Sequence, residues 1–278
     1  MSHLRNGNFT SGEIFNLISE GKEKGTFGKP ALTYIQGKNY ERKLNRALNS
    51  DVSARPTSWG NLVEIHAFGL LDLNYKITSE LTIIHPEHSF WVGTPDGVNA
   101  KTNTVFDIKC PFTLKSFCEL VECKTAEELR ENHKDGEKYY WQLVSNAILT
   151  ISKFAELIVY CPYKSELEAI RELASNFDGD QNKIAWIGFS QDDDLPYLIE
   201  GGHYKNLNII RFEVSEEDKK ALTERVIEAG KKLVKCDEEI IDVKIYNEKI
   251  HPTEQQILSA QEKIKAMNEL KAKLKHVI

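Results

Sequence analysis

The sequence lacks the features that mark membrane, secreted and disulfide-stabilised proteins. It has no run of 18 or more apolar residues, so we expect no transmembrane helix. The opening residues 1–7 contain no apolar stretch of the signal-peptide type. The five cysteines form no Cys-x-x-Cys pair, and an odd number without a pattern argues against a disulfide framework, a zinc site or an iron–sulfur cluster. We therefore expect a cytoplasmic protein whose cysteines are free thiols.

Internal repeats and low-complexity tracts are also absent. The 278 residues, 41% hydrophobic and 28% charged, suit one large globular domain, expected over residues 1–250, followed by a separate C-terminal segment, 251–278. The net charge is −6, which disfavours nucleic-acid binding by the chain as a whole. Residues 1–50 nevertheless hold eight Lys and Arg against four Glu, a local charge of +4. A basic arm could contact phosphate, or it could be a solvated charged face.

The hydrophobic pattern predicts a mixture of helices and strands, and therefore an α/β fold. Helical spacing or capping residues predict helices beginning near Thr10 and over residues 31–48, 58–70, 115–123, 126–133, 137–151, 164–177 and 216–236. Runs rich in β-branched and aromatic residues predict strands over residues 75–84, 89–92, 154–161, 183–189 and 208–214.

Residues 93–109 are the stretch around which the rest is organised. Two apolar runs flank a turn rich in Gly, Asn and Lys, which is typical of a hairpin. Alternation along the second run places Asp107 and Lys109 on one face of its strand. Asp96 lies where the preceding predicted strand, which ends at Gly93, gives way to a Pro-Asp-Gly bend. We expect Asp96, Asp107 and Lys109 to meet, and two carboxylates with an amine suit a divalent cation and an activated water.

Four further polar residues are candidates for the same site. Glu64 lies on a predicted helix and could project toward the hairpin, although spacing alone favours a surface carboxylate. Gln142 lies in an otherwise apolar and aromatic predicted helix. It is either a buried amide with satisfied hydrogen bonds or a group that orients water or phosphate. His85 and His88 lie in a turn without partners at ligand spacing, so metal ligation is disfavoured.

Residues 253–278 form an amphipathic pattern with a Lys- and Glu-rich opposite face. Such a helix needs a partner surface. It could fold back on its own domain, join subunits or bind another protein.

The order of these elements resembles the PD-(D/E)xK nuclease superfamily. Within it, several motifs together resemble the lambda-exonuclease (YqaJ-type) family of phage recombination nucleases. They are Trp59-Gly60-x-x-x-Glu64, Thr94-Pro95-Asp96-Gly97, Asp107-Ile108-Lys109-Cys110-Pro111-Phe112-Thr113 and Tyr140-x-Gln142. The resemblance covers residues 5–162 and implies a restriction-endonuclease-like core with a mixed central β-sheet flanked by helices. Asp107 is a departure, since the lambda enzyme has the longer glutamate there.

The resemblance also implies a metal site. Asp96, Asp107 and the Ile108 carbonyl would hold Mg²⁺, and Glu64 would bind a second ion or its water shell. Mn²⁺ would substitute, because all of these ligands are oxygens. Lys109 would orient the attacking water and offset charge.

Two other roles are implied by the resemblance. Gln142 would orient water or substrate. The amino-terminal segment resembles the family segment that holds the 5′-phosphate end of DNA, with Arg5, Thr10 and Ser11 beside the Thr94 hydroxyl. Gly12 stands where the family has its second phosphate-binding serine, so the donors of this pocket differ.

The function implied is a Mg²⁺-dependent 5′→3′ double-strand DNA exonuclease. It would release mononucleotides and leave 3′ overhangs for an annealing protein in phage or prophage recombination, as a ring-shaped trimer that threads double-stranded DNA ends. Two alternatives stay open, since a fold does not fix a reaction: a structure-specific endonuclease, and a non-catalytic DNA-binding scaffold.

Overall fold

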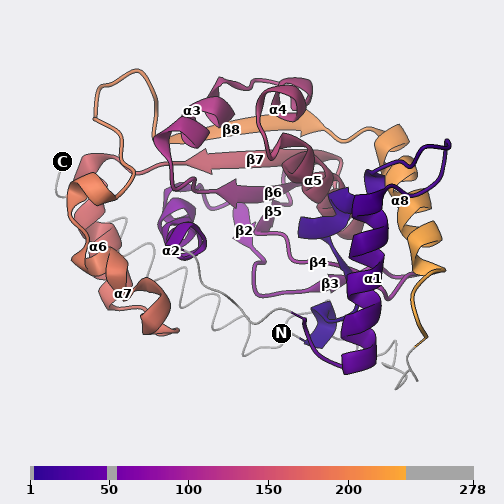
Figure 1. Cartoon of the computed structure of the whole chain (residues 1–278). Coiled ribbons are helices and arrows are strands. Elements are labelled where there is room, and N and C mark those ends of the chain that lie inside the picture. The colour runs from indigo at the N-terminus through magenta and orange to yellow at the C-terminus, as the bar shows by residue number, and fades with distance from the viewer. Residues whose placement is uncertain (1–2, 49–54, 236–278) are drawn as a thin grey trace.

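The computed structural model describes residues 3–48 and 55–235 (Figure 1). In chain order the elements are η1 (His3–Arg5), β1 (Phe9–Thr10), η2 (Ser11–Ile18), α1 (Lys29–Leu44), α2 (Arg55–Leu70), β2 (Tyr75–Ile77), β3 (Ile83–Ile84), β4 (Trp91–Gly93), β5 (Gly97–Asn99), β6 (Thr104–Lys109), α3 (Leu114–Glu122), α4 (Ala126–Asn132), α5 (Gly136–Thr150), β7 (Phe154–Tyr160), η3 (Lys164–Glu166), α6 (Leu167–Ser175), α7 (Gln181–Phe189), η4 (Asp192–Asp194), β8 (Leu207–Glu213) and α8 (Glu216–Gly230), where η denotes a 3₁₀ helix. This α/β architecture confirms the expected fold class.

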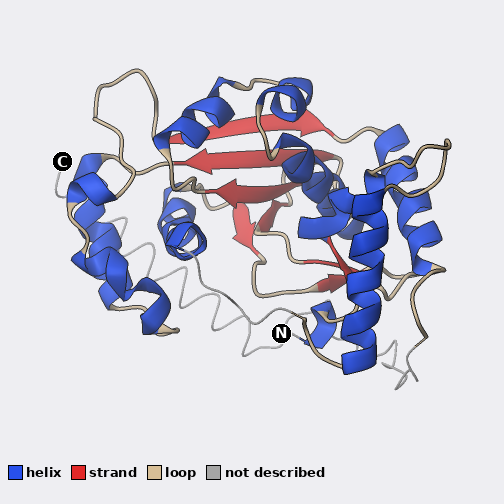
Figure 2. Cartoon of the chain, in the orientation of Figure 1, coloured by secondary structure: helices blue, strands red, loops and turns tan. Residues whose placement is uncertain are grey.

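The main sheet has five strands in the order β2-β5-β6-β7-β8 (Figure 2). It is mixed, because β6 and β7 run parallel while the other neighbours are antiparallel. The hairpin predicted within residues 93–109 is formed by β5 and β6. Its turn ends at Asn103, whose φ of 50° is a left-handed conformation that asparagine tolerates.

Helices cover both faces of this sheet. Ala155, Leu157 and Val159 of β7 face a core built with α3, α4, α5 and α8. Ile158 and Tyr160, which alternate with them, face a second core built with α2, α6 and α7. The near-continuous apolar sequence of β7 follows from this two-sided burial.

A second, three-stranded sheet has the order β1-β4-β3. In it β1 runs parallel to β4, with Phe9 opposite Trp91 and Thr10 opposite Val92. The amino-terminal segment is thereby attached to the strand that leads into residues 93–109.

Two predicted strands are wrong. The strand expected over residues 75–84 is divided into β2 and β3, which belong to different sheets. Residues 183–189 form helix α7, whose first turn is capped by the Asp180 carboxylate accepting a bond from Asn182 N. Ile184 and Ile187 are buried against α6 and α2 at helical spacing. The short apolar run fitted either structure, and the cap with these tertiary contacts decides it.

The other expectations have mixed outcomes. Cys110, Cys118, Cys123 and Cys161 are free thiols as predicted. Ser215 caps α8 by accepting a bond from Asp218 N, also as predicted. None of the helices in the described ranges combines the length and apolar character that a membrane crossing needs. Cys236, the 250/251 domain boundary and the amphipathic segment 253–278 lie outside the described residues.

Candidate active site

Asp96 lies in the loop between β4 and β5, against the carboxyl end of β6. Its Oδ2 accepts a hydrogen bond of 2.6 Å from Ile108 N. The Ile108 amide can bond to Asp96 because the β5–β6 pairing ends at Gly97 opposite Phe106, before it reaches Ile108. The amide and carbonyl of one strand residue point the same way, so the Ile108 carbonyl also faces the Asp96 side.

Asp107 is buried in β6 and is held from two directions. Gln142 Nε2 of α5 donates a hydrogen bond of 2.6 Å to Asp107 Oδ1. The Lys109 ammonium forms an ion pair with Asp107 Oδ2, as the shared face of the strand predicted. The structure therefore brings Asp96, Asp107, Lys109 and Gln142 together.

Glu64 belongs to the same group of charges. It lies on α2, where burial and then the neighbouring Asp107 carboxylate raise its pKa to about 7. The same two effects, burial and Asp107, with Glu64 adding to them, raise the pKa of Asp96 well above its ordinary value. Glu64 thus lies close to Asp107 and is not the exposed surface carboxylate that spacing alone favoured.

Lys109 carries the positive charge of this cluster. Burial by itself would lower its pKa, but Asp107 and Asp96 outweigh burial and the net shift is upward. Its Nζ also lies 5.1 Å from the centre of the Tyr139 ring. Lys109 is therefore held as a cation.

Tyr139 is a neighbour of Lys109 that the candidate residues predicted from the sequence did not include. The signal was its position three residues before Gln142, on the same face of α5. The Tyr139 ring stacks on His133 at 5.7 Å. His133 is itself fixed, because Nδ1 accepts from Asp135 N and Nε2 bonds to Ser116 Oγ.

The oxygen donors of this cluster suit a hard divalent cation. Glu64, Asp96 and Asp107 supply three carboxylates against the single cation Lys109, and oxygen-only ligands favour Mg²⁺ or Mn²⁺. No group of three or more His, Cys, Asp or Glu side chains within residues 3–48 and 55–235 is arranged to enclose a metal ion. Asp96 and Asp107 instead bond to Ile108 N, Gln142 and Lys109. The residues fit the ion chemically, and binding it requires these contacts to rearrange.

The amino-terminal residues reach the expected neighbourhood in part. The β1–β4 pairing places Thr10 and Ser11 beside the end of β4, and a methyl group at Gly93 would collide with Ser11 Oγ. Both residues are buried, and the Ser11 hydroxyl bonds at 2.8 Å to Ser145 Oγ. Thr94 Oγ1 lies 3.3 Å from Thr82 Oγ1.

Arg5 is exposed in η1, and within the described residues no hydrogen bond or ion pair joins it to Thr10, Ser11 or Thr94. Its segment is anchored instead on α1. Arg42 Nε donates a 2.6 Å bond to Gly7 O, and Glu41 Oε2 accepts a 2.8 Å bond from Gly7 N.

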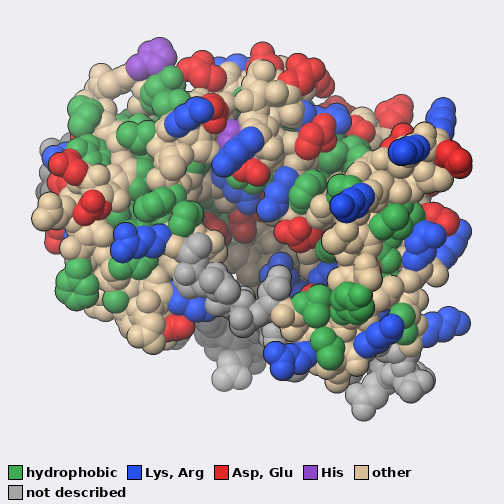
Figure 3. Space-filling view, in the orientation of Figure 1, with side chains coloured by type: hydrophobic (Ala, Val, Ile, Leu, Met, Phe, Trp, Pro, Cys, Tyr) green, Lys and Arg blue, Asp and Glu red, His purple; other side chains and the backbone are tan. Residues whose placement is uncertain are grey.

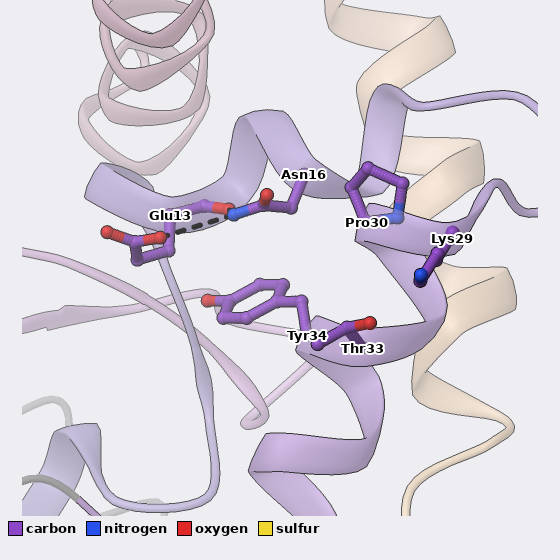
Figure 4. Close-up of a pocket in the computed structure, with 6 residues that line it drawn as sticks. All are labelled: Glu13, Asn16, Lys29, Pro30, Thr33 and Tyr34. Atoms are coloured by element: carbon purple, nitrogen blue, oxygen red, sulfur yellow. Dashed lines mark hydrogen bonds between the residues drawn. The ribbon is translucent and has the colours of Figure 1, made fainter.

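A separate groove of about 440 Å³ lies between η2 and α1 (Figure 4). Its lining residues are Glu13, Asn16, Lys29, Pro30, Thr33 and Tyr34. Within it Glu13 accepts a bond from the Asn16 amide. None of the predicted site residues lines this groove.

Comparison with known proteins finds solved structures that share the fold. No family model and no curated protein matches the sequence. Among solved structures, a phage-related exonuclease from Haemophilus somnus 129PT has a TM-score of 0.53 at 17% identity, over 81% of this chain and 92% of that one. An alkaline exonuclease from Laribacter hongkongensis, LHK-Exo, has a TM-score of 0.51 at 14% identity, over 97% and 96% of the two chains. Its complex with dAMP has a TM-score of 0.52 at 14% identity, over 98% and 97%.

The chain has the fold of these phage-related and alkaline exonucleases. At this identity the likeness establishes the shared fold alone, and the activity is argued from the site.

Proposed function

We propose that this protein is a metal-dependent deoxyribonuclease that degrades double-stranded DNA from its ends. The observation that carries the proposal is the convergence of Glu64, Asp96 and Asp107 with Lys109 at the end of β6. Acidic groups that share one place with a single lysine suit phosphodiester hydrolysis. The fold shared with exonucleases supports the same reaction.

Asp96, Asp107 and the Ile108 carbonyl are the residues that would hold Mg²⁺ or Mn²⁺, with Glu64 toward a second ion. A divalent ion stabilises the negative charge that develops on the phosphate oxygens. The raised pKa values of Glu64 and Asp96 are consistent with this assignment, because closely placed carboxylates in a buried setting favour a cation.

Lys109 serves the attacking water in this proposal. Its ion pair with Asp107 and its position over Tyr139 keep it protonated, so it orients the water and offsets charge instead of removing a proton. Gln142 fixes the Asp107 carboxylate through its 2.6 Å bond, which sets the direction of the remaining oxygen lone pairs.

The product and direction are further parts of the proposal. LHK-Exo has been crystallised with dAMP, a mononucleotide, and we infer mononucleotide release for this chain as well. We also propose digestion in the 5′→3′ direction, with the 5′-terminal phosphate bound near Thr94 and Arg5. Thr10 and Ser11 would form part of the same phosphate-binding pocket. The remaining 3′ strand would pass to a single-strand annealing protein, and a homo-trimer would enclose the DNA.

The test is digestion of linear duplex DNA labelled at either end, with and without a 5′-phosphate, in Mg²⁺ or Mn²⁺. We expect loss of the 5′ label as mononucleotide and survival of covalently closed circles. Cleavage of closed circles would identify an endonuclease instead. Absence of cleavage with either ion would refute the proposed activity.

Variants locate the activity. Asp96→Ala should abolish metal-dependent digestion while the circular dichroism spectrum and Tm stay close to wild type. Asp194→Ala removes an exposed carboxylate in η4 and is the matched control, which should digest DNA like wild type. Equal activity of the two variants would contradict the assignment of the site.

A further inference from the structure

A row of aromatic side chains lies beside the acidic cluster and takes no part in it. Trp59 of α2 is buried and meets Phe112 edge-on at 6.1 Å. Phe112 in turn meets Trp186 of α7 edge-on at 5.8 Å. The guanidinium of Arg55 lies 5.2 Å from the Trp186 ring centre. We call Arg55, Phe112, Trp186 and Phe189 the aromatic platform.

Phe189 adds an exposed ring on the same helix as Trp186. It is three residues after Trp186 on α7, so the two are neighbours on the helix surface. Its side chain is 89% exposed, which leaves a whole phenyl ring in water. Trp186 is held in place because its Nε1 donates a 3.1 Å bond to Lys183 O. The exposed phenyl ring and the fixed indole give α7 two aromatic side chains of the kind that are enriched at binding surfaces.

The platform is connected to the proposed nuclease site through two elements. Phe112 follows Lys109 by three residues at the end of β6. Helix α2 carries both Arg55 and Glu64, which are about 13 Å apart along the axis at 1.5 Å per residue. A Cβ at Gly60 of this helix would lie 3.9 Å from Cys110 O. Helix α2 therefore packs against the residue that follows β6.

The side of the molecule formed by α6 and α7 also borders a hollow. Figure 3 shows this hollow between that side and the side formed by α1, with acidic side chains visible inside it. Helix α7 packs on α2 at the same side. Helix α7, which carries Trp186 and Phe189, therefore lies on one side of this hollow.

From these observations we infer that the aromatic platform binds the bases of an unpaired DNA strand next to the nuclease site. The inference rests on the proposed function and adds a subsite to it. A base stacks on the exposed phenyl ring or on the outer plane of the Arg55 guanidinium, whose other side rests on Trp186. Charge supports a nucleic-acid occupant, because no ion pair joins Arg55 to a carboxylate in the described parts of the chain.

The occupant is single-stranded because bases inside a duplex have both π faces covered by their neighbours, whereas successive unpaired bases can each turn a face toward the platform. Stacking is tolerant of sequence, which suits a strand of any composition. The binding of an unpaired strand beside the cluster keeps the two strands of a partly digested end apart.

Binding and cleavage are measured separately on the full-length protein. The probe for binding is a short fluorescein-labelled oligodeoxythymidine, titrated in EDTA so that no cleavage occurs. We expect Trp186→Leu and Phe189→Ser each to weaken binding about tenfold, while Trp186→Phe stays within about threefold. Arg55→Gln should weaken binding and lower the slope of log K against log salt by about one.

The control is Lys164→Gln. Lys164 lies 5.3 Å from the Tyr197 ring centre, a cation–aromatic pair outside the platform, and its loss should leave binding unchanged. Phe189→Ser changes an exposed side chain, so it keeps the test valid even where Trp186→Leu unfolds. Hydrolysis of bis(p-nitrophenyl) phosphate in Mn²⁺ reports the acidic cluster alone and should be equal in wild type and Phe189→Ser.

Two results would overturn the platform while leaving the nuclease intact. One is unchanged oligonucleotide affinity in Phe189→Ser, Arg55→Gln and Trp186→Leu with normal digestion. The other is a change of mass by light scattering in Phe189→Ser without a change in affinity, which would assign the surface to contact between copies of the chain. Failure of the proposed function appears differently, as wild type that neither digests DNA nor hydrolyses the small phosphodiester.

Discussion

Gln142 on α5 donates a 2.6 Å hydrogen bond to Asp107 on β6, which ties the central helix to the acidic strand. The Gln142 amide contacts only one oxygen of this carboxylate, because the other oxygen, Asp107 Oδ2, forms an ion pair with Lys109. One carboxylate is thereby shared between a neutral donor and a cation. This sharing orients the Asp107 carboxylate before any ligand arrives.

Replacing Gln142 should therefore lower activity without unfolding the protein. Gln142→Ala removes the donor, and loss of such a supporting contact costs about 10- to 100-fold in activity or metal affinity. Gln142→Glu should lose more, because it adds a carboxylate beside Asp107. The measurement is the initial digestion rate across a Mg²⁺ titration, with Tm as the check on folding. Wild-type rates in Gln142→Glu would disprove the orienting role.

The ring beneath Lys109 makes a separate prediction. Tyr139→Phe keeps the aromatic face toward the Lys109 ammonium and should retain most of the digestion rate. Tyr139→Leu removes the face and should lower kcat by about fivefold, with KM for DNA near the wild-type value, given about 1 kcal/mol for a partly desolvated cation–π contact. Equal rates in the two variants would show that the ring does not position Lys109.

The sequence was sufficient for the centre of the fold. Alternation along residues 104–109 predicted that Asp107 and Lys109 share a face, and the ion pair confirms it. Buried runs such as β7 and capped helices such as α8 were also recognisable, because their patterns are long and local.

The failures came where tertiary contacts decide. The nine residues of α7 fitted a strand equally well, and packing on α6 and α2 selected the helix. Glu64 was ambiguous because no spacing rule could place α2 over the end of β6. The Ser11–Ser145 bond joins residues 134 positions apart, and local pattern holds no information about such a pair.

Arg225 should contribute to stability by holding the amino-terminal segment on α8. Its guanidinium donates to the carbonyls of Leu17, Ser19, Gly25 and Thr26, and lies 4.1 Å from the Phe27 ring centre. Arg225→Met should lower the free energy of unfolding by about 2 kcal/mol in urea titrations, since several carbonyls lose their donor. Lys220→Met, an exposed change on the same helix, should shift it by less than about 0.5 kcal/mol. Equal effects would mean that water replaces the guanidinium.

His133 should make stability fall in mild acid. Burial lowers its pKa, so the folded protein holds the neutral ring while the unfolded chain takes up a proton near pH 6.5. The stability it contributes is present above that pH and is lost as pH falls through the lower folded value. Glu64 acts with the opposite sign, because its raised pKa favours folding as pH falls below about 7.

The test therefore compares wild type with His133→Asn, which keeps an acceptor for Asp135 N, in urea unfolding from pH 7 to pH 5. The difference in unfolding free energy between the two proteins should shrink toward pH 5, and a constant difference would contradict a neutral buried His133.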